Sequence, residues 1–366
     1  MIPVSTDYVN IIANGGHYEW RIVNYNKTID ADLKRGSLTL TLFEQASIGN
    51  VLASQLDFEY YDDGVALNTS YPLVVSFRAV GDSSTSEWLQ KGSFRIDTIE
   101  QSPYSDVVKV TAFDDLLKAN VPWMKSGTFA PTTDLAIVRS IASDIGVTIN
   151  ASTLSEFNNP IQITEAPSIG ENGTTSLEML SYIGIMHGGN WIIDSNGKLK
   201  LIKLFSEQGF QPHIANVGDA VEDFDASPVE YVVGVCIWNS ENHYFRVPNV
   251  TDEEWERLSG RIIDAKCYIG ASQELAQTLY DTFSGKAYHP YTTSKAWVDL
   301  KYELGDGITI KDVSSVICNQ TINLTALGSC SLEAKSRDIV TSHYPVPTPV
   351  ERQIARQEAK TQAYIN

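Results

Sequence analysis

The stretch Phe94–Lys118, FRIDTIEQSPYSDVVKVTAFDDLLK, indicates the fold class because its hydrophobic period changes along its length. Residues 94–97 and 108–112 each alternate apolar and polar side chains, the pattern of strands with one solvent-facing side. A polar turn that contains a proline separates the two runs. Asp114 or Asp115 can then cap a short helix that carries two leucines. The stretch therefore predicts a β-hairpin that runs directly into a helix, where an all-β unit ends.

The residues before this stretch are also predicted to form strands. Residues 37–43 and 73–79 place apolar side chains at alternate positions, and Asp62-Asp63-Gly64 supplies turn chemistry between them. Several short strands separated in this way indicate a barrel or a sandwich. Residues 1–122 are therefore expected to be β throughout.

Residues 123–205 switch to a helical period. A Thr-Thr-Asp cap and a terminal glycine bound a predicted helix over residues 135–145. Thr175–Glu178 has the form of a capping box and precedes a second helix. Residues 191–203 predict a hairpin with Asn-Gly at its tip. Together these signals predict a small α+β unit.

From residue 206 the strand pattern returns. Residues 231–238 are apolar nearly throughout and predict a strand buried on both faces. Two helical pieces follow, one after the capping-box form Thr251–Glu254 and one with an apolar stripe over residues 275–283. Residues 295–304 alternate most regularly of all, with Trp297 as the only exception, and predict a strand.

The C-terminal residues differ from the rest. His343–Pro349 predicts a stiff, extended linker, and a helix with a thin apolar face follows it. Such a helix is not expected to be stable alone. Two interpretations stay open, a helix that packs in an assembly and a frayed polar terminus.

Composition places the chain among ordered globular proteins. It has 366 residues, of which 43% are hydrophobic and 20% charged, and about two to four domains are expected. The N-terminus lacks a signal-peptide pattern, and no apolar run approaches the ~20 residues that span a bilayer. A soluble protein made in a cytoplasm is expected. The cysteines are far apart and predict buried thiols rather than zinc ligands: Cys236, Cys267, Cys318 and Cys330.

Net charge argues against a nucleic-acid-binding protein. The chain carries 45 acidic and 27 basic side chains, a net charge of −18, and phosphate contacts require lysine and arginine. The excess of acids has two interpretations. It can simply confer solubility, or it can provide a surface that nucleic acid passes without adhering.

Three runs resemble, in the same order, landmarks of the phage tail baseplate hub family, also called the tail-associated or Tal-like family, which includes hubs of contractile phage-tail-like particles. The runs are residues 92–119, GSFRIDTIEQSPYSDVVKVTAFDDLLKA; residues 188–202, GGNWIIDSNGKLKLI; and residues 298–310, VDLKYELGDGITI. They are patterns of turns and strands without chemically unique residues. Only this resemblance favours the interpretation of the acidic charge as a non-adhesive channel.

The resemblance implies an α+β fold that is mainly β. It consists of two split β-barrel, tube-type domains, a small α+β domain between them and a helical insertion in the second barrel. The expected division is a first barrel at 1–122, the α+β domain at 123–205, a second barrel at 206–240 and 291–340, an inserted domain at 241–290, and the linker and helix at 341–366.

The resemblance also implies a structural role in the virion tail, at the baseplate or tail tip, with assembly in the bacterial host cytoplasm. A homotrimer with two barrels per chain would match a hexameric tail tube or distal tail protein above and a threefold spike or fibre protein below. Tape measure protein or DNA would pass through an acidic channel without specific binding. The resemblance covers both phages and tailocins.

No catalytic motif stands out in the sequence. Nucleotide-binding loops, zinc-protease and nucleophile-elbow motifs are all missing. The remaining patterns are better explained by strand edges, a helix dipole, turns and helix starts: His17 with Glu19, His187, a calcium-loop start at Asp223 and Asp225 that Pro228 interrupts, and the pairs Asp62-Asp63, Asp114-Asp115 and Glu253-Glu254. We expect no catalytic residue, no cofactor and no metal, and therefore no enzyme.

Two other functions remain open. A carbohydrate- or receptor-binding tail protein would present an exposed aromatic platform, whereas the seven tryptophans are scattered and fit core packing. A peptidoglycan-cleaving tail protein would carry a lytic domain after the hub region. The chain ends at Asn366, just beyond the predicted linker, and no room for such a domain is expected.

Overall fold

The fold was examined in a computed structural model. It describes residues 1–43, 47–101, 104–123, 130–164, 174–203, 216–217, 221–240 and 242–335. The predicted C-terminal linker and helix lie outside the described residues.

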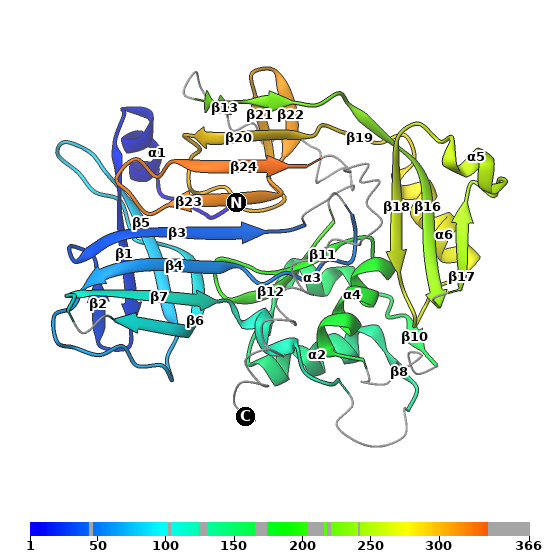
Figure 1. The fold of residues 1–366 in the computed structure, drawn as a ribbon, viewed down its shortest axis with the longest axis horizontal. Helices are drawn as coiled ribbons and strands as arrows, with labels where there is room; N and C mark the ends of the chain where they lie inside the picture. The colour runs from blue at the N-terminus through cyan, green and yellow to red at the C-terminus, as the bar shows by residue number, and fades with distance from the viewer. Residues whose placement is uncertain are drawn as a thin grey trace.

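Strands dominate the described part of the chain (Figure 1). The helices are α1 Thr6–Ala13, the 3-10 helix η1 Asp115–Ala119, α2 Asp134–Ile145, α3 Ala151–Glu156, α4 Ser176–Met186, α5 Asp252–Glu256 and α6 Gln273–Phe283. The strands up to the first helical region are β1 His17–Asn24, β2 Lys27–Ile29, β3 Leu33–Thr41, β4 Gln55–Tyr61, β5 Leu73–Val80, β6 Leu89–Gln101 and β7 Val107–Phe113. The middle strands are β8 Thr132–Thr133, β9 Thr148–Ile149, β10 Gln162–Ile163, β11 Asn190–Ile193, β12 Lys198–Ile202, β13 Asn216–Val217, β14 Val221–Glu222 and β15 Asp225–Ala226. The last strands are β16 Glu230–Ser240, β17 His243–Val247, β18 Arg261–Lys266, β19 Ala287–Tyr288, β20 Tyr291–Ala296, β21 Gly307–Ile310, β22 Val313–Val316, β23 Asn319–Asn323 and β24 Cys330–Ala334.

One large sheet joins the beginning and the end of the described chain. Its strand order is β14-β20-β24-β23-β3-β4-β7-β6-β5-β1-β2, and β15 also pairs with β20. The two parts meet where β3 pairs antiparallel with β23, with Leu38 opposite Ile322. Both side chains are buried, because alternate positions of each strand face the core. Figure 1 shows β3, β4, β7 and β23 side by side.

The far end of this sheet curls back toward β23. The backbone N–H of Tyr18 in β1 donates to the carbonyl of Ala326, at 2.8 Å, in the turn that follows β23. The Trp20 indole N–H donates to the carbonyl of Thr325 at 2.9 Å. The described strand order is nevertheless open, and no closed barrel is formed by these strands. The mainly β character is confirmed, and the split-barrel arrangement stays a prediction.

The predicted hairpin and its helix are confirmed. β6 and β7 pair antiparallel, and the carboxylate of Asp114 caps the next helix by accepting the N–H of Leu116 at 2.9 Å. This helix is a 3-10 helix rather than an α-helix. The α2 cap at Thr133, the α4 capping box and the β11–β12 hairpin also lie where the local signals predict them.

The inserted segment uses a strand that we expected in the second barrel. β16 lies between β17 and β18 in a separate sheet, and α6 packs against β16 and β17. The family resemblance had placed residues 231–238 with the strands of the second barrel. Their apolar character fits the central position that β16 holds between two partners.

The prediction of a regular strand over residues 295–304 is wrong beyond Ala296, because β20 ends at that residue. The predicted alternation of buried side chains is nevertheless present: Val298, Leu300, Tyr302 and Leu304 face the core. This segment lies against side chains instead of a neighbouring strand. The alternating pattern therefore identified which side chains are buried, but the backbone here forms turns rather than a ladder of strand hydrogen bonds.

The N-terminal helix α1 is absent from the sequence prediction, which treated residues 1–122 as β. Ser5 caps α1 by accepting the N–H of Tyr8 at 3.2 Å, and Tyr8 and Ile11 are buried. The local signals were Ser5 as N-cap and Asp7 in the first turn. They lie outside the strand pattern that dominates this part of the chain.

Candidate functional surface

The four histidines in the described part of the chain lie apart from one another, each in its own local setting. His17 is exposed at the start of β1, and His187 caps the C-terminus of α4. His243 contacts Asn239, and His289 accepts a hydrogen bond from Ser315 through its carbonyl. Among the described residues, no group of three or more His, Cys, Asp or Glu side chains could hold a metal ion. His213 and His343 lie outside the described residues.

His187 has a structural partner. Its Nε2 lies 2.7 Å from Oδ2 of Asp134, which is fully buried, while Oδ1 of Asp134 accepts the N–H of Ile161 at 3.0 Å. The ring of Phe157 packs on the imidazole with centroids 4.3 Å apart. The pair ties the start of α2 to the end of α4. No nucleophilic side chain contacts it among the described residues.

The carboxylate pairs satisfy backbone groups at turns and helix starts. Asp62 accepts the N–H of Gly64 at 2.9 Å, and Glu254 completes the capping box of α5 with Thr251. Asp223 accepts a hydrogen bond from the hydroxyl of Ser294 at 3.1 Å. None of these arrangements brings two carboxylates around a common reacting position.

All four cysteines are buried and free. Burial raises the pKa of Cys236 and of Cys267 to about 12, and that of Cys330 to about 11. The pKa of Cys318 is also raised, mainly by burial. Thiols of this kind are poor nucleophiles because the thiolate is disfavoured.

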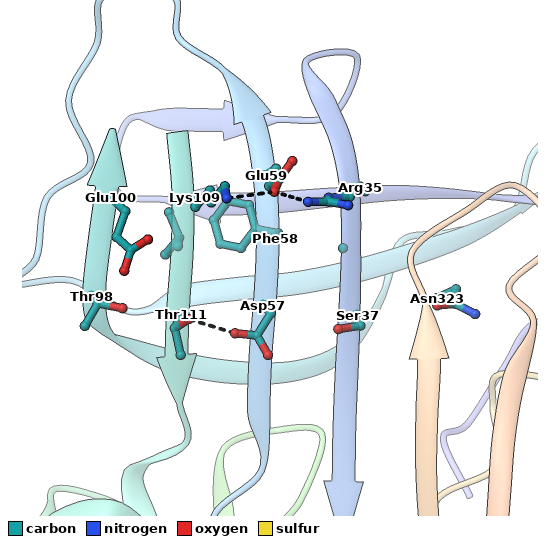
Figure 2. Close-up of a pocket in the computed structure, with 12 residues that line it drawn as sticks. Arg35, Ser37, Asp57, Phe58, Glu59, Thr98, Glu100, Lys109, Thr111 and Asn323 are labelled. Carbon is teal, nitrogen blue, oxygen red and sulfur yellow. Dashed lines mark hydrogen bonds and ion pairs between the residues drawn. The ribbon is translucent and has the colours of Figure 1, made fainter. Parts of the chain in front are cut away.

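The large sheet has a hollowed polar face that the sequence did not single out. A groove of about 440 Å³ lies over β6, β7, β4 and β3 and reaches Asn323 at the end of β23 (Figure 2). Its outward side chains are Thr98 and Glu100 from β6, Lys109 and Thr111 from β7, Asp57 and Glu59 from β4, and Arg35 and Ser37 from β3. They point outward because alternate residues of each strand face away from the core.

Glu59 is the charged side chain of this groove that the basic residues surround. Glu59 pairs with Arg35, and its other neighbours are Lys34 and Lys109, each at 3.8 Å. The hydrogen bond from Arg35 lowers the pKa of Glu59, and it outweighs the opposing effect of desolvation. Asp57 accepts a hydrogen bond from the hydroxyl of Thr111 at 2.7 Å (Figure 2). The basic side chains of the groove are therefore engaged by Glu59 and do not form a free cationic cluster.

A second groove of about 300 Å³ continues the polar face across β3, β23 and β24. Its polar lining residues are Thr39, Thr41, Gln55, Asn319, Thr321, Ser331, Glu333 and Lys335. The two grooves together hold four carboxylates and three basic side chains, so this face is nearly neutral although the chain carries −18. We call the outward side chains of both grooves the polar face.

The polar face depends on a pairing between distant segments. The hydroxyls of Thr39 and Thr321 lie 3.4 Å apart across the β3–β23 junction. No local signal indicates that these two strands are neighbours. The sequence alone therefore indicated that each strand has a solvent-facing side, but not that these sides form one continuous surface.

Comparison with known proteins identifies the fold. No protein-family model and no curated protein matches the sequence. Among solved structures, the prophage MuSo2 43 kDa tail protein from Shewanella oneidensis superposes with a TM-score of 0.52 at 15% identity, over 86% of this chain and 97% of that chain. A tail protein from Neisseria meningitidis MC58 gives a TM-score of 0.54 at 12% identity, over 88% and 97%. The chain thus shares its fold with phage tail proteins, which confirms the sequence resemblance at the level of the fold.

Proposed function

We propose that this chain is a structural component of a phage tail or a phage-tail-like particle, and that it acts as a trimeric hub at the tail tip or baseplate. The observation that carries the proposal is the large sheet, which continues from β1–β7 into β20, β23 and β24 within a fold shared with tail proteins. Each chain would contribute two tube-type parts of this sheet. Three chains would then form a pseudo-sixfold ring.

Such a ring would join a hexameric tail tube or distal tail protein to a threefold spike or fibre. The polar face suits the wall of its channel. Its hydroxyl, amide and paired charged groups offer no basic cluster that would hold phosphates. DNA or tape measure protein would slide past without specific binding, and the wall would be nearly neutral rather than strongly acidic.

The proposal assigns no covalent chemistry to the chain. The chain's location would be the virion tail, after assembly in the host cytoplasm. In the described part of the chain, no helix is long and apolar enough to cross a membrane. His187 and the carboxylates of Asp62, Asp114 and Glu254 satisfy groups at helix ends and turns, as is typical of structural residues.

Light scattering of the purified chain at several concentrations tests the oligomeric state. We expect a trimer or a monomer–trimer equilibrium that shifts with concentration. A stable dimer would contradict the hub. An electron cryomicroscopy reconstruction of the trimer then tests the channel: the Thr39–Thr321 junction should line its wall, and a polar face on the outside of the ring would refute that assignment.

A further inference from the structure

Exposed tyrosines gather at one end of the large sheet. Among the described residues five tyrosines are exposed, and four of them belong to this end: Tyr25, Tyr61, Tyr71 and Tyr104, with exposed fractions of 62%, 45%, 43% and 99%. Val65, exposed by 45%, lies in the same loop region. We call these five residues the tyrosine tip. A gathering of large exposed side chains on one end of a molecule marks an interaction surface.

Side-chain and backbone contacts hold the tip together. The rings of Tyr25 and Tyr71 stack with centroids 4.3 Å apart, and Asn24 donates to the carbonyl of Tyr71 at 3.1 Å. The buried ammonium of Lys27 donates to the carbonyl of Val65 at 2.6 Å. The side chains are therefore presented on fixed loops rather than on a loose strand end.

The β4 end and the β6–β7 turn belong to the same tip. The backbone N–H of Asp62 donates to the carbonyl of Asp106 at 2.7 Å, and Gln101 donates to the Asp62 carboxylate at 2.9 Å. Tyr61 precedes Asp62, and Tyr104 lies in the turn that leads to Asp106. Residues that are distant in sequence thus form one contiguous end.

Carboxylates surround these tyrosines. Asp30, Asp32, Asp62 and Asp106 are exposed, and Lys34 is the basic side chain beside Tyr61. Arg95 donates to the carbonyl of Ser70, next to Tyr71, and is paired with Asp115 at 3.1 Å. The hydrogen bond from Gln101, together with the N–H of Gly64, lowers the pKa of Asp62 and keeps its carboxylate charged. The ammonium of Lys27 forms an ion pair with the carboxylate of Asp63 at 2.6 Å. The tip is therefore aromatic and acidic.

We infer that the tyrosine tip is the docking surface for a different protein whose contact face carries lysine and arginine side chains. Carboxylates pair with such cations, and tyrosine rings accept them through cation–π contacts while providing rigid contact area. A second copy seated tip to tip is a poor occupant, because the exposed carboxylates of the two tips would face and repel one another. The inference rests on the proposed function and adds to it: the tip contacts a neighbouring, non-identical tail component.

Photo-crosslinking in assembled particles tests the tip. A photoreactive phenylalanine analogue replaces Tyr25 or Tyr71, and the same replacement at Tyr231, exposed by 54% outside the tip, is the matched control. We expect both tip positions to crosslink to a non-identical tail protein, at a peptide that mass spectrometry identifies as containing lysine or arginine. Crosslinks between two copies, or none in particles that contain the chain, would overturn the inference. Particles that lack the chain altogether would refute the proposed function instead.

Charge reversal gives a second readout that does not depend on crosslinking. We expect D106K, combined with Y25S, to reduce incorporation into particles at least tenfold, while the purified variant keeps the oligomeric mass and the unfolding midpoint of the native chain. The matched control combines D82K, at an exposed position in the turn after β5, with Y231S on β16, and this double variant should be incorporated normally. Equal incorporation of both variants would contradict the inference. A changed oligomeric mass for the tip variant alone would mean that a second copy is the occupant.

Discussion

Lys91 is a buried cation that joins two distant parts of the chain. Its ammonium donates to the carbonyls of Leu300 and Tyr302 at 2.7 and 2.6 Å, which satisfies backbone groups that no neighbouring strand pairs. Tyr8 acts nearby, since its hydroxyl donates to the Asp299 carboxylate at 2.6 Å. This explains how residues 298–304 can be buried without belonging to a ladder. Tyr8 from α1 and Lys91 from β6 supply polar contacts that a neighbouring strand would otherwise supply.

Burial lowers the pKa of Lys91 to about 8, although nearby carboxylates oppose the shift. Between about pH 8 and the ordinary lysine value near 10.4 the unfolded chain binds more protons, so the free energy of unfolding rises with pH. We expect K91M to lack this rise, and the native chain to gain up to about 3 kcal/mol over the variant across that window. Denaturant unfolding at several pH values measures it.

K109M removes an equivalent charge from an exposed position on β7, whose side chain is 60% exposed. The native chain should keep a constant difference from this control over the same pH range. Parallel pH curves for the native chain and K91M would show that the Lys91 ammonium is not desolvated as the structure requires.

Asp114 has the opposite pH behaviour. Burial raises its pKa to about 7, even though its carboxylate accepts the N–H groups of Ser54 and Leu116. Between about pH 4 and pH 7 the folded chain therefore binds more protons, and stability falls as pH rises. We expect D114N to be less sensitive to pH in this window, by about 1.4 kcal/mol for each unit of pKa shift. D106N, at an exposed site, is the control, and a larger fall for D114N than for the native chain would refute the assignment.

At the scale of elements, the sequence predicted what neighbouring residues control. The cap at Thr133, the left-handed glycine at Gly146 and the capping box at Thr175 are local signals, and the helices lie where they indicate. Strand partners depend on residues far apart in the chain. No pattern near Thr39 indicates that Thr321 lies opposite it, so neither the sheet order nor the polar face could be predicted.

The turn after β23 covers the edge of β1, and Gly328 lies in this turn. Gly328 has a φ of +56°, and a Cβ there would lie 2.8 Å from Tyr18 and 3.0 Å from Leu300. We expect G328A to lose about 1–2 kcal/mol from the left-handed backbone and about 1–3 kcal/mol more from overpacking. G64A has the same left-handed requirement, at φ +82°, with open space around it. It should lose only the first part in denaturant unfolding, and equal losses would contradict the close packing of this turn.

The whole molecule distributes its charge unevenly. The polar face is nearly neutral, whereas the tyrosine tip carries exposed carboxylates at the end of the same strands. The excess of acidic side chains that gives the net charge of −18 is therefore not spread evenly over the surface. The nearly neutral polar face suits a polymer that passes without binding. The acidic tyrosine tip suits a basic protein.

The large sheet makes the first part of the chain dependent on the last. Residues 1–123 end after η1 and would lack β23, which pairs with β3 over residues 37–41. They would also lack residues 298–304, which cover Tyr8 and Lys91. We expect the isolated fragment 1–123 to show no cooperative unfolding transition, because an unpaired strand edge and an uncovered core are exposed together. Circular dichroism in increasing denaturant measures this.

Co-expression of fragment 1–123 with residues 124–366 is the matched control. The second fragment restores both the β23 edge and the covering segment, so the two should purify as a complex that unfolds in one transition. A fragment 1–123 that unfolds cooperatively alone would mean that the border expected near residue 122 separates independent domains. The β3–β23 pairing would then be a contact between two folded units rather than part of one core.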